Sequence, residues 1–313
     1  MVLKDIPILI LSFNRPDHLK KCMANLRTQN VNNIFISIDG PRNSLDKKKQ
    51  DNIFRVINEN KAFFNIKINY LERNFGCKNG VKKGIDWFFK QVPKGIIIED
   101  DVSISKNCLL SFIYLLEKYK NSSTIMSISS HNEFINFKKQ ILLKSPIFRA
   151  WGWAGWSEMW FKHRKFSDQI INYSLRDIKN ILPYRYANIK NAKLLKDCQL
   201  KFIDTWDYEY NFSHIALGLY SLTISGVNCI NFGFDENATH TKSNQSDNFK
   251  NLINYEIENE KVLDMERNII IQTNKISGFE WGQNQDNLLN YFYMKYLGFF
   301  LYLRKFKRNL LHK

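Results

Sequence analysis

Short apolar runs alternate with helical patterns over the first 130 residues. Residues 6–11 form an apolar run of the length typical of a buried strand. Leu19, Met23 and Leu26 then recur at the three- to four-residue spacing of a helix with one apolar face. Pro16 suits the first turn of that helix, where a backbone N–H has no intrahelical partner. The pattern therefore predicts a strand followed by a helix.

Four further apolar runs are predicted as strands, at 34–38, 66–71, 96–98 and 125–128. Strands separated by helical patterns are typical of βαβ units in a parallel sheet. The right-handed crossover rule places the carboxyl ends of such strands along one edge of the sheet. We therefore predict an α/β fold with a mostly parallel, Rossmann-like central sheet and flanking helices.

After about residue 140 the pattern becomes more helical and more aromatic. Residues 149–160 are dense in Trp and Gly, a basic helical stretch follows, and 227–232 is predicted as a last strand. Because no internal repeat and no Pro/Ser-rich linker is visible, we predict one compact unit with two lobes. Its expected parts are a catalytic domain with halves 1–130 and 131–241, and a helical, aromatic C-terminal extension at 242–313.

Polar residues directly follow four of the predicted strands. The fourth strand shows this most sharply, because it runs into Glu99, Asp100 and Asp101. Adjacent carboxylates repel one another, and a divalent cation is the usual way to neutralise them; an acidic turn in solvent is the alternative. The other polar residues at strand ends are Ser12, Asn14, Arg15, Asp39 and Arg73.

These strand ends are expected to share one edge, where open parallel sheets bind ligands. Carboxylates suit a metal and ribose hydroxyls, and guanidinium groups suit a diphosphate. The set as a whole predicts a site for a nucleotide diphosphate with a divalent metal.

The formal net charge of +16 favours anionic partners, such as phosphorylated small molecules, an anionic membrane surface or nucleic acid. Nucleic acid is the least favoured, because no zinc, helix-turn-helix or RNA-recognition signature is visible. The five cysteines are scattered with no CxxC pair, which argues for a reducing compartment. Without a signal-peptide layout or an uncharged stretch long enough to span a bilayer, we expect a cytoplasmic protein.

Four motifs follow one another in the first third of the chain: Ile-Leu-Ser-Phe-Asn-Arg-Pro at 10–16, Ile-Asp-Gly at 38–40, Arg-Asn-Phe-Gly at 73–76 and Glu-Asp-Asp at 99–101. Their order and spacing resemble nucleotide-sugar glycosyltransferases of the GT-A fold, in the bacterial family-2-like branch. The acidic motif is also similar to that of animal N-acetylglucosaminyltransferase I. The resemblance covers about residues 5–130 and is looser over later segments.

The resemblance implies a metal-dependent hexosyl- or N-acetylhexosaminyl-transferase. Such an enzyme moves a sugar from a nucleotide diphosphate sugar to a surface-glycan or lipid-linked acceptor, here with inversion favoured. Mn²⁺ is the expected metal, with Mg²⁺ as the alternative. Asp101 would bind the metal, Asp100 the ribose or the metal's water shell, and Glu99 the donor sugar. A sugar nucleotidyltransferase is the second hypothesis, although it usually carries a Gly-rich loop with a Lys near the first strand.

The resemblance also implies contacts to the nucleotide and its diphosphate. Asp39 would read the base, and a solvated loop face is the alternative for Arg73 and Lys78. The full set of these implied contacts is Ser12, Asn14, Arg15, Asp39, Arg73 and Lys78.

The general base is the least determined part of the site. An inverting transfer needs a carboxylate to take the proton of the acceptor hydroxyl. Asp207 fits the position that the family uses, with Glu209 and Asp204 as competitors and a helix N-cap as the structural alternative. The sequence departs from the family here, because no plain Glu-Asp pair is followed by an Arg-bearing helix.

An imidazole and two indoles complete the residues expected at the site. His240 is expected to bind the metal by resemblance, since neutral imidazole is a reasonable Mn²⁺ ligand; a surface histidine is the alternative. Trp151 and Trp153 are expected to stack on sugar. Trp156 and Trp160, at i and i+4, are expected to pack a helix.

The segment 287–303 is apolar and aromatic, and four Lys or Arg residues follow it within 304–308. It could form an interfacial helix on an anionic leaflet, a core helix or an oligomer contact. The first interpretation predicts a peripheral protein on the inner face of the membrane.

Overall fold

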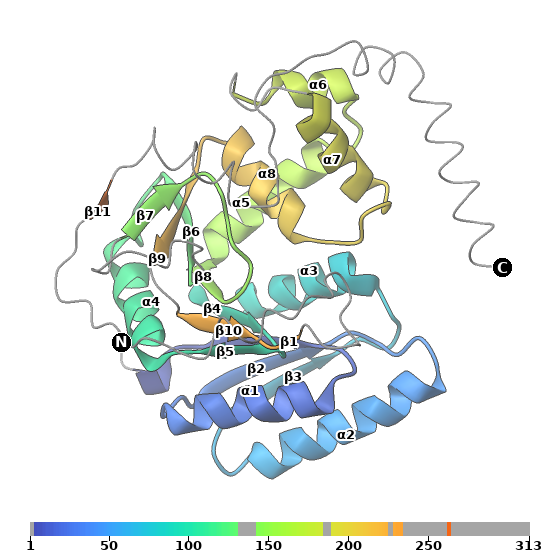
Figure 1. Cartoon of the computed structure of the whole chain (residues 1–313), viewed down its shortest axis with the longest axis vertical. Coiled ribbons are helices and arrows are strands. Elements are labelled where there is room, and N and C mark those ends of the chain that lie inside the picture. The colour runs from blue at the N-terminus through green and yellow to red at the C-terminus, as the bar shows by residue number, and fades with distance from the viewer. Residues whose placement is uncertain (1–2, 131–141, 184–188, 225–227, 234–261, 264–313) are drawn as a thin grey trace.

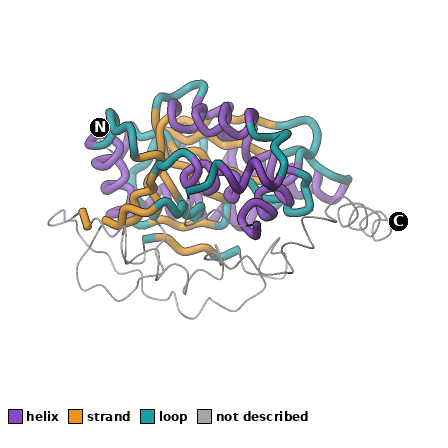
Figure 2. Tube along the Cα trace, turned by 90° about the horizontal axis from the view of Figure 1, so that it is seen from above, coloured by secondary structure: helices purple, strands orange, loops and turns teal. Residues whose placement is uncertain are grey.

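The computed structural model describes residues 3–130, 142–183, 189–224, 228–233 and 262–263. Their helices and strands form one continuous body (Figure 2). The strands are β1 Ile8–Ser12, β2 Asn33–Ile38, β3 Asn65–Tyr70, β4 Lys94–Glu99, β5 Val102–Ile104, β6 Ile125–Ser129, β7 Leu142–Ser145, β8 Trp153–Trp156, β9 Tyr220–Ile224, β10 Cys229–Asn231 and β11 Val262–Leu263. The helices are η1 Leu3–Asp5 (3₁₀), α1 Pro16–Thr28, α2 Ser44–Asn60, α3 Gly76–Phe89, α4 Lys106–Lys118, α5 Ser157–Gln169, α6 Leu175–Asn180, α7 Ile189–Gln199 and α8 Asp207–Ala216.

The central sheet has nine strands in the order β11-β7-β9-β6-β8-β4-β1-β2-β3. Strand β1 pairs in parallel with both β4 and β2, and β2 pairs in parallel with β3. The pairs β6 with β9 and β7 with β11 are also parallel. Strand β8 runs antiparallel between β4 and β6, and β7 runs antiparallel to β9. The predicted α/β fold with a mostly parallel, Rossmann-like sheet is confirmed.

A second sheet pairs β5 with β10 in antiparallel register. Strand β10 lies within the segment predicted as the last strand, but it belongs to this small sheet rather than to the central one. The pairing matters for the site, because β5 begins directly after the acidic triplet and β10 therefore lies beside it.

Helices cover both faces of the β1–β2–β3 part of the sheet. Helices α1 and α2 lie along one face and α3 along the other, while α5, α6, α7 and α8 gather on the α3 side (Figure 1). This arrangement follows from the strand order, because the crossover from β3 to β4 reverses direction across the sheet and carries α3 to the opposite face.

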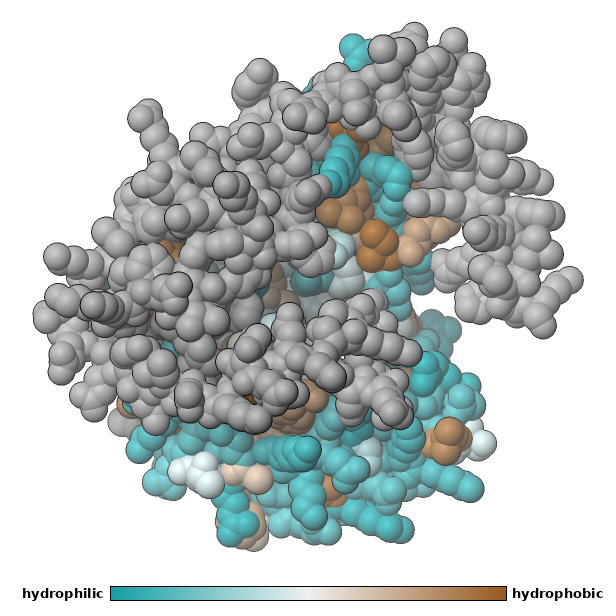
Figure 3. Space-filling model, viewed as in Figure 1, coloured by the Kyte–Doolittle hydropathy of each residue, from teal (hydrophilic) through white to brown (hydrophobic). Residues whose placement is uncertain are grey.

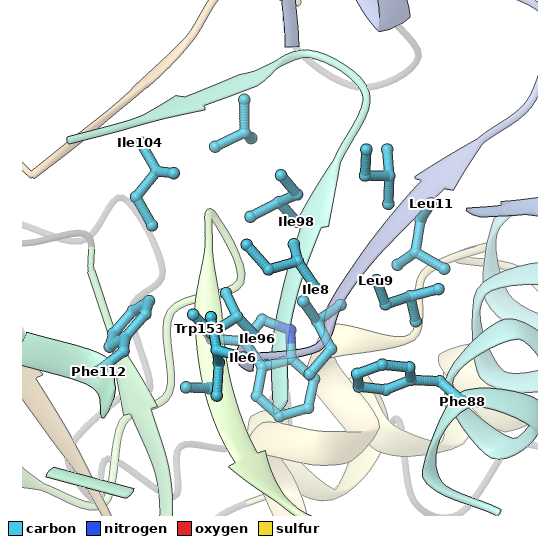
Figure 4. Close-up of a cluster of buried hydrophobic side chains, with 14 of the residues drawn as sticks. Ile6, Ile8, Leu9, Leu11, Phe88, Ile96, Ile98, Ile104, Phe112 and Trp153 are labelled. Atoms are coloured by element: carbon cyan, nitrogen blue, oxygen red, sulfur yellow. The ribbon is translucent and has the colours of Figure 1, made fainter. Parts of the chain in front are cut away.

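The main core lies between the sheet and its helices. Strand β1 is buried at all five positions, and its isoleucines and leucines pack with the isoleucines of β4 in the main core (Figure 4). Runs of β-branched residues suit strands covered on both faces. A smaller core joins the helices of the second half, with Ile178, Leu195 and Phe212 at its centre.

Candidate functional site

The carboxyl ends of β1, β2 and β4 open into a cleft of about 1020 Å³. The residues predicted at strand ends that line it are Ser12, Asn14, Arg15, Asp39, Glu99, Asp100 and Asp101. Trp151 and Asp204, from the second half of the chain, line it as well. On the side seen in Figure 3, the surface over α1 and α2 is mostly hydrophilic. The cleft thus lies at the edge where parallel sheets bind ligands.

Asp100 and Asp101 share the guanidinium of Arg15. Arg15 Nη2 lies 2.7 Å from Asp100 Oδ1, and Arg15 Nη1 lies 2.8 Å from Asp101 Oδ2. Ser12 donates a hydrogen bond from Oγ to Asp100 Oδ2 at 2.7 Å. Both acids are buried, with 1% of Asp100 and 5% of Asp101 exposed. One guanidinium therefore faces two buried carboxylates.

The electrostatics of the triplet reflect burial and crowding. Burial and then the charge of Asp101 raise the pKa of Glu99 to about 8, although Arg15 opposes them. Burial also raises the pKa of Asp100, against the opposing effect of Arg15. Burial lowers the pKa of Arg15, but the charges of Asp100, Asp101 and Glu99 outweigh it, so the net shift is upward. A further cation would be stabilised by the negative charge that Arg15 leaves uncompensated.

Asp101 is enclosed by the residues that directly follow β10, about 130 positions later in the chain. Phe232 donates its backbone N–H to the carbonyl of Asp101 at 2.9 Å. A Cβ on Gly233 would lie 2.1 Å from Asp101 Oδ2, so only glycine allows this approach. Asp101 Oδ1 is buried and accepts no hydrogen bond from the described residues. The structure thus holds a desolvated, unsatisfied carboxylate oxygen at the end of β4.

His18 is a site residue that the sequence interpretation missed. It lies in the first turns of α1, is 8% exposed and lines the cleft. One ligand atom from each of His18, Asp100 and Asp101 lies within 4.8 Å of the other two. Two carboxylates and an imidazole are a donor set that fits Mn²⁺. The available signal was its position three residues after Arg15, about one helical turn along α1.

Asp39 holds the loop that precedes α3. Its carboxylate accepts hydrogen bonds from the backbone N–H groups of Gly40, Phe75 and Gly76, and from the side chain of Asn74. Burial raises the pKa of Asp39 in spite of these bonds. The sequence-based role was to read the base. In the structure Asp39 lines the cleft, but both of its oxygens are engaged by the loop.

Asp204 caps α3 from outside that helix. Its carboxylate accepts hydrogen bonds from the backbone N–H groups of Cys77 at 3.1 Å and Lys78 at 3.2 Å, which lie 127 and 126 residues earlier in the sequence. These N–H groups have no partner within the helix, so a distant carboxylate satisfies them. The capping alternative considered for Asp204 is therefore what the structure shows, although the capped helix is α3 and not α8.

Glu209 is held in a buried ion pair. It is 2% exposed, and its carboxylate pairs with the ammonium groups of Lys78 and Lys82. Lys78 also donates to the carbonyl of Cys198 at 2.6 Å. The role expected for Lys78 at the diphosphate is therefore corrected, because its side chain is buried in this ion pair and is absent from the described cleft lining.

Asp207 begins α8 and is half-buried. Thr205 donates its hydroxyl to Asp207 Oδ1. Asp207 does not line the cleft formed by the described residues. It lies close enough to Glu99 for its charge to contribute to the raised pKa of that side chain. Of the other two acids considered as the base, Asp204 holds two backbone N–H groups and Glu209 holds two lysines.

The predicted arginine and tryptophans divide between surface, cleft and core. Arg73 is exposed and stacks over the Phe75 ring at 4.8 Å, outside the described cleft lining. Trp151 lines the cleft. Trp153 is 1% exposed within β8, so the stacking role expected for it is corrected to core packing. Trp156 and Trp160 are also buried in the main core.

Several sequence-based expectations fall outside the described residues. These are His240, the amphipathic segment 287–308, and all of the C-terminal extension except 262–263. Among the helices that the structure describes, none has the length and apolar character needed to cross a membrane.

Comparisons with known proteins add little to these observations. No protein-family model and no curated protein matches the chain. Among solved structures, a protein assigned as a glucose-1-phosphate thymidylyltransferase from Bacillus anthracis, in complex with a sucrose, matches with 9% identity and a TM-score of 0.33, over 52% of this chain and 77% of its own. HddC from Yersinia pseudotuberculosis matches with 12% identity and a TM-score of 0.30, over 49% and 77%. TM-scores this low support no inference about this chain, so its fold class rests on the observed sheet.

Proposed function

We propose that this protein is a metal-dependent glycosyltransferase of the GT-A fold that uses a nucleotide diphosphate sugar as donor. The observation that carries the proposal is the buried pair Asp100 and Asp101, in which one carboxylate oxygen accepts no hydrogen bond from the described residues, beside a large cleft at the carboxyl edge of a parallel sheet. Burying carboxylates without full compensation is costly, so such a pair is typical of a cation site. The ordered motifs around the same edge support the nucleotide-sugar assignment.

Asp101 would hold the metal, Mn²⁺ or as the alternative Mg²⁺. When bound, the metal would neutralise the donor diphosphate and stabilise the departing nucleoside diphosphate. Asp100, fixed by Ser12 and Arg15, would face the ribose or the metal's water shell. Glu99 and Trp151 line the cleft where the donor sugar would lie. The loop held by Asp39 would border the base.

Asp207 is our choice for the general base of an inverting transfer. It would take the proton of the acceptor hydroxyl as that oxygen attacks the anomeric carbon. The competing acids are already engaged, Asp204 by two backbone N–H groups and Glu209 by two lysines. Asp207 also lies near the acidic triplet, since its charge contributes to the raised pKa of Glu99.

The acceptor that we propose is a surface glycan, including one carried by a lipid at the inner face of the membrane. The net charge of +16 supports an anionic surface or acceptor. The basic, aromatic segment 287–308 would provide the contact of a cytoplasmic enzyme with the membrane.

A product assay tests this proposal. The full chain is incubated with nucleotide diphosphate sugars and Mn²⁺, and the products are identified by mass spectrometry. We expect release of nucleoside diphosphate with sugar transferred to an acceptor or to water. Asp101→Asn and Asp207→Asn should each lower the transfer rate at least a hundredfold, since each removes a group that acts in the reaction. Pyrophosphate formed from a nucleoside triphosphate and a sugar phosphate would instead show a nucleotidyltransferase.

A further inference from the structure

We propose that His18 is a ligand of the divalent cation, together with Asp100 and Asp101. This inference rests on the metal-dependent function proposed above, assigns the imidazole of its site, and takes Asp100 as a direct ligand rather than a group at the ribose or in the water shell. It places that ligand on α1, whereas the sequence interpretation sought it at His240.

The three side chains converge although they come from two parts of the fold. Their candidate ligand atoms lie within 4.8 Å of one another, and all three residues are buried. Ligand bonds of about 2.0–2.2 Å bring two opposite ligands on one cation to about 4.4 Å. Three ligands spaced evenly around a cation at such distances lie about 3.8 Å apart, so the three atoms need to close by up to about 1 Å to share one cation.

The unsatisfied oxygen of Asp101 is the independent observation that points to a ligand. Arg15 and Ser12 use Asp100 Oδ1, Asp100 Oδ2 and Asp101 Oδ2, and only Asp101 Oδ1 is left, buried and accepting no hydrogen bond from the described residues. A buried carboxylate oxygen without a partner costs free energy unless a ligand satisfies it. A cation bound by this oxygen would remove that cost.

The charges leave room for a cation beside Arg15. Two buried carboxylates face one guanidinium, so Arg15 can compensate only one of their two charges. Lys21, the nearby cation on α1, lies over the Phe232 ring at 5.6 Å. Asp100 and Asp101 together therefore keep one negative charge after the charge of Arg15 is counted.

The surroundings of His18 fix its ring. The edge of the His18 ring meets the Phe232 ring at 90°, with the centroids 5.3 Å apart. Phe232 is tied through its backbone N–H to the carbonyl of Asp101. The segment directly after β10 therefore packs against both Asp101 and the imidazole of His18.

Mn²⁺ binding to the full chain, without any nucleotide, tests the inference. Electron paramagnetic resonance gives the affinity, and electron spin-echo modulation from ¹⁴N shows directly whether an imidazole is bound. We expect wild-type protein to show one ¹⁴N coupling. His18→Gln should abolish that coupling and weaken Mn²⁺ binding at least tenfold, whereas the matched change His214→Gln, in the core, should leave both unchanged in the folded protein.

The wild-type spectrum decides the matter even if His18→Gln folds poorly. Absence of ¹⁴N modulation from bound Mn²⁺, or no Mn²⁺ binding at all, would overturn the inference. Modulation that is lost in His240→Gln and kept in His18→Gln would do the same. If Asp101→Asn abolishes Mn²⁺ binding while His18→Gln does not affect it, only the role of His18 fails and the proposed function stands. If Asp101→Asn binds Mn²⁺ as wild type does, the metal site of the proposed function fails too.

Discussion

Arg15 neutralises only one side of Asp101: its Nη1 lies 2.8 Å from Oδ2, while Oδ1 of the same carboxylate is buried and accepts no hydrogen bond from the described residues. The arginine acts as an internal counter-ion for the acidic pair, but an incomplete one. A bound cation would complete the compensation, so Arg15 and the metal should depend on each other.

Arg15→Gln should make the protein less stable and more responsive to metal. Removing the guanidinium leaves two buried carboxylates without their partner, which should lower the free energy of unfolding by about 3 kcal/mol. Added Mn²⁺ should then raise the melting temperature of the variant by more than that of wild type, because the cation replaces the missing charge. Differential scanning fluorimetry with and without Mn²⁺ measures both effects.

Arg42→Gln is the matched control for this change. Arg42 also lines the cleft, but it pairs with Asp46 and not with the acidic triplet. Its Mn²⁺ response should equal that of wild type. Equal responses of Arg15→Gln and wild type would show that Arg15 does not act as the counter-ion of the metal site.

Gly233→Ala should damage the cation site without unfolding the protein. The new methyl group would lie 2.1 Å from Asp101 Oδ2, so the carboxylate must move away from its position. We expect Mn²⁺ affinity, measured by calorimetry, to fall at least tenfold. Gly218→Ala is the control, since Gly218 has φ +64° and a Cβ added there would meet no atom within 4 Å. It should cost about 1 kcal/mol of stability and leave Mn²⁺ affinity unchanged; the opposite pattern would contradict the enclosure of Asp101.

Glu209→Gln should affect stability and not chemistry. The substitution leaves the buried ammonium groups of Lys78 and Lys82 without a counter-charge, which typically costs about 3–5 kcal/mol. Urea denaturation measures this loss, and the transfer rate per folded molecule should stay within about twofold of wild type. A hundredfold loss of transfer with unchanged stability would instead identify Glu209 as the base.

The contribution of His214 to stability should fall as the pH is lowered from about 7 to about 4, while Glu99, whose pKa burial raises to about 8, acts in the opposite direction over the same range. Burial lowers the pKa of His214 to about 4, and its Nδ1–H donates to the carbonyl of Tyr210 while Nε2 accepts from Ser127. The unfolded chain binds a proton near its ordinary pKa of 6.5 and the folded chain does not, so this group opposes folding increasingly through that range, by about 3 kcal/mol in total. His163, whose pKa burial lowers further, adds to the effect.

His214→Gln removes one of these titrations. The slope of unfolding free energy against pH between 6 and 4.5 should therefore decrease by about 1.4 kcal/mol per pH unit. Urea denaturation at several pH values measures the slope. An unchanged slope would mean that His214 does not change its protonation state on unfolding in this range.

The sequence predicted the sheet and its polar edge because both are local. Apolar runs reveal strands, and the residues that follow Ser12 and Ile98 necessarily share an edge once the strands are parallel. Local pattern placed Trp160 in a helix, but it assigned Trp156 to the same helix although Trp156 ends β8, and it could not tell Trp151 from Trp153. They are two residues apart, yet one lines the cleft and the other is inside β8.

The relationships that the sequence did not predict join distant segments. Lys78 resembles a ligand-binding cation until its partner Glu209 is placed beside it in the fold. His18 can be recognised as a site residue only once the fold places the start of α1 beside Asp100 and Asp101. Gly233 can be recognised only once β10 is paired with β5. Pairing of this kind depends on tertiary packing, for which a single sequence carries no local signal.

Nucleotide-dependent thermal stabilisation tests the central claim most directly. Wild-type protein and Asp101→Asn are screened by differential scanning fluorimetry against nucleoside diphosphates and their sugars, with and without Mn²⁺. We predict that at least one nucleotide diphosphate sugar raises the melting temperature of wild type only when Mn²⁺ is present, and that Asp101→Asn shows no such rise, because ligands that bind the folded state alone raise its apparent stability. Stabilisation that is the same without Mn²⁺, or the same in Asp101→Asn, would contradict the claim that Asp101 holds a metal for a nucleotide-sugar donor.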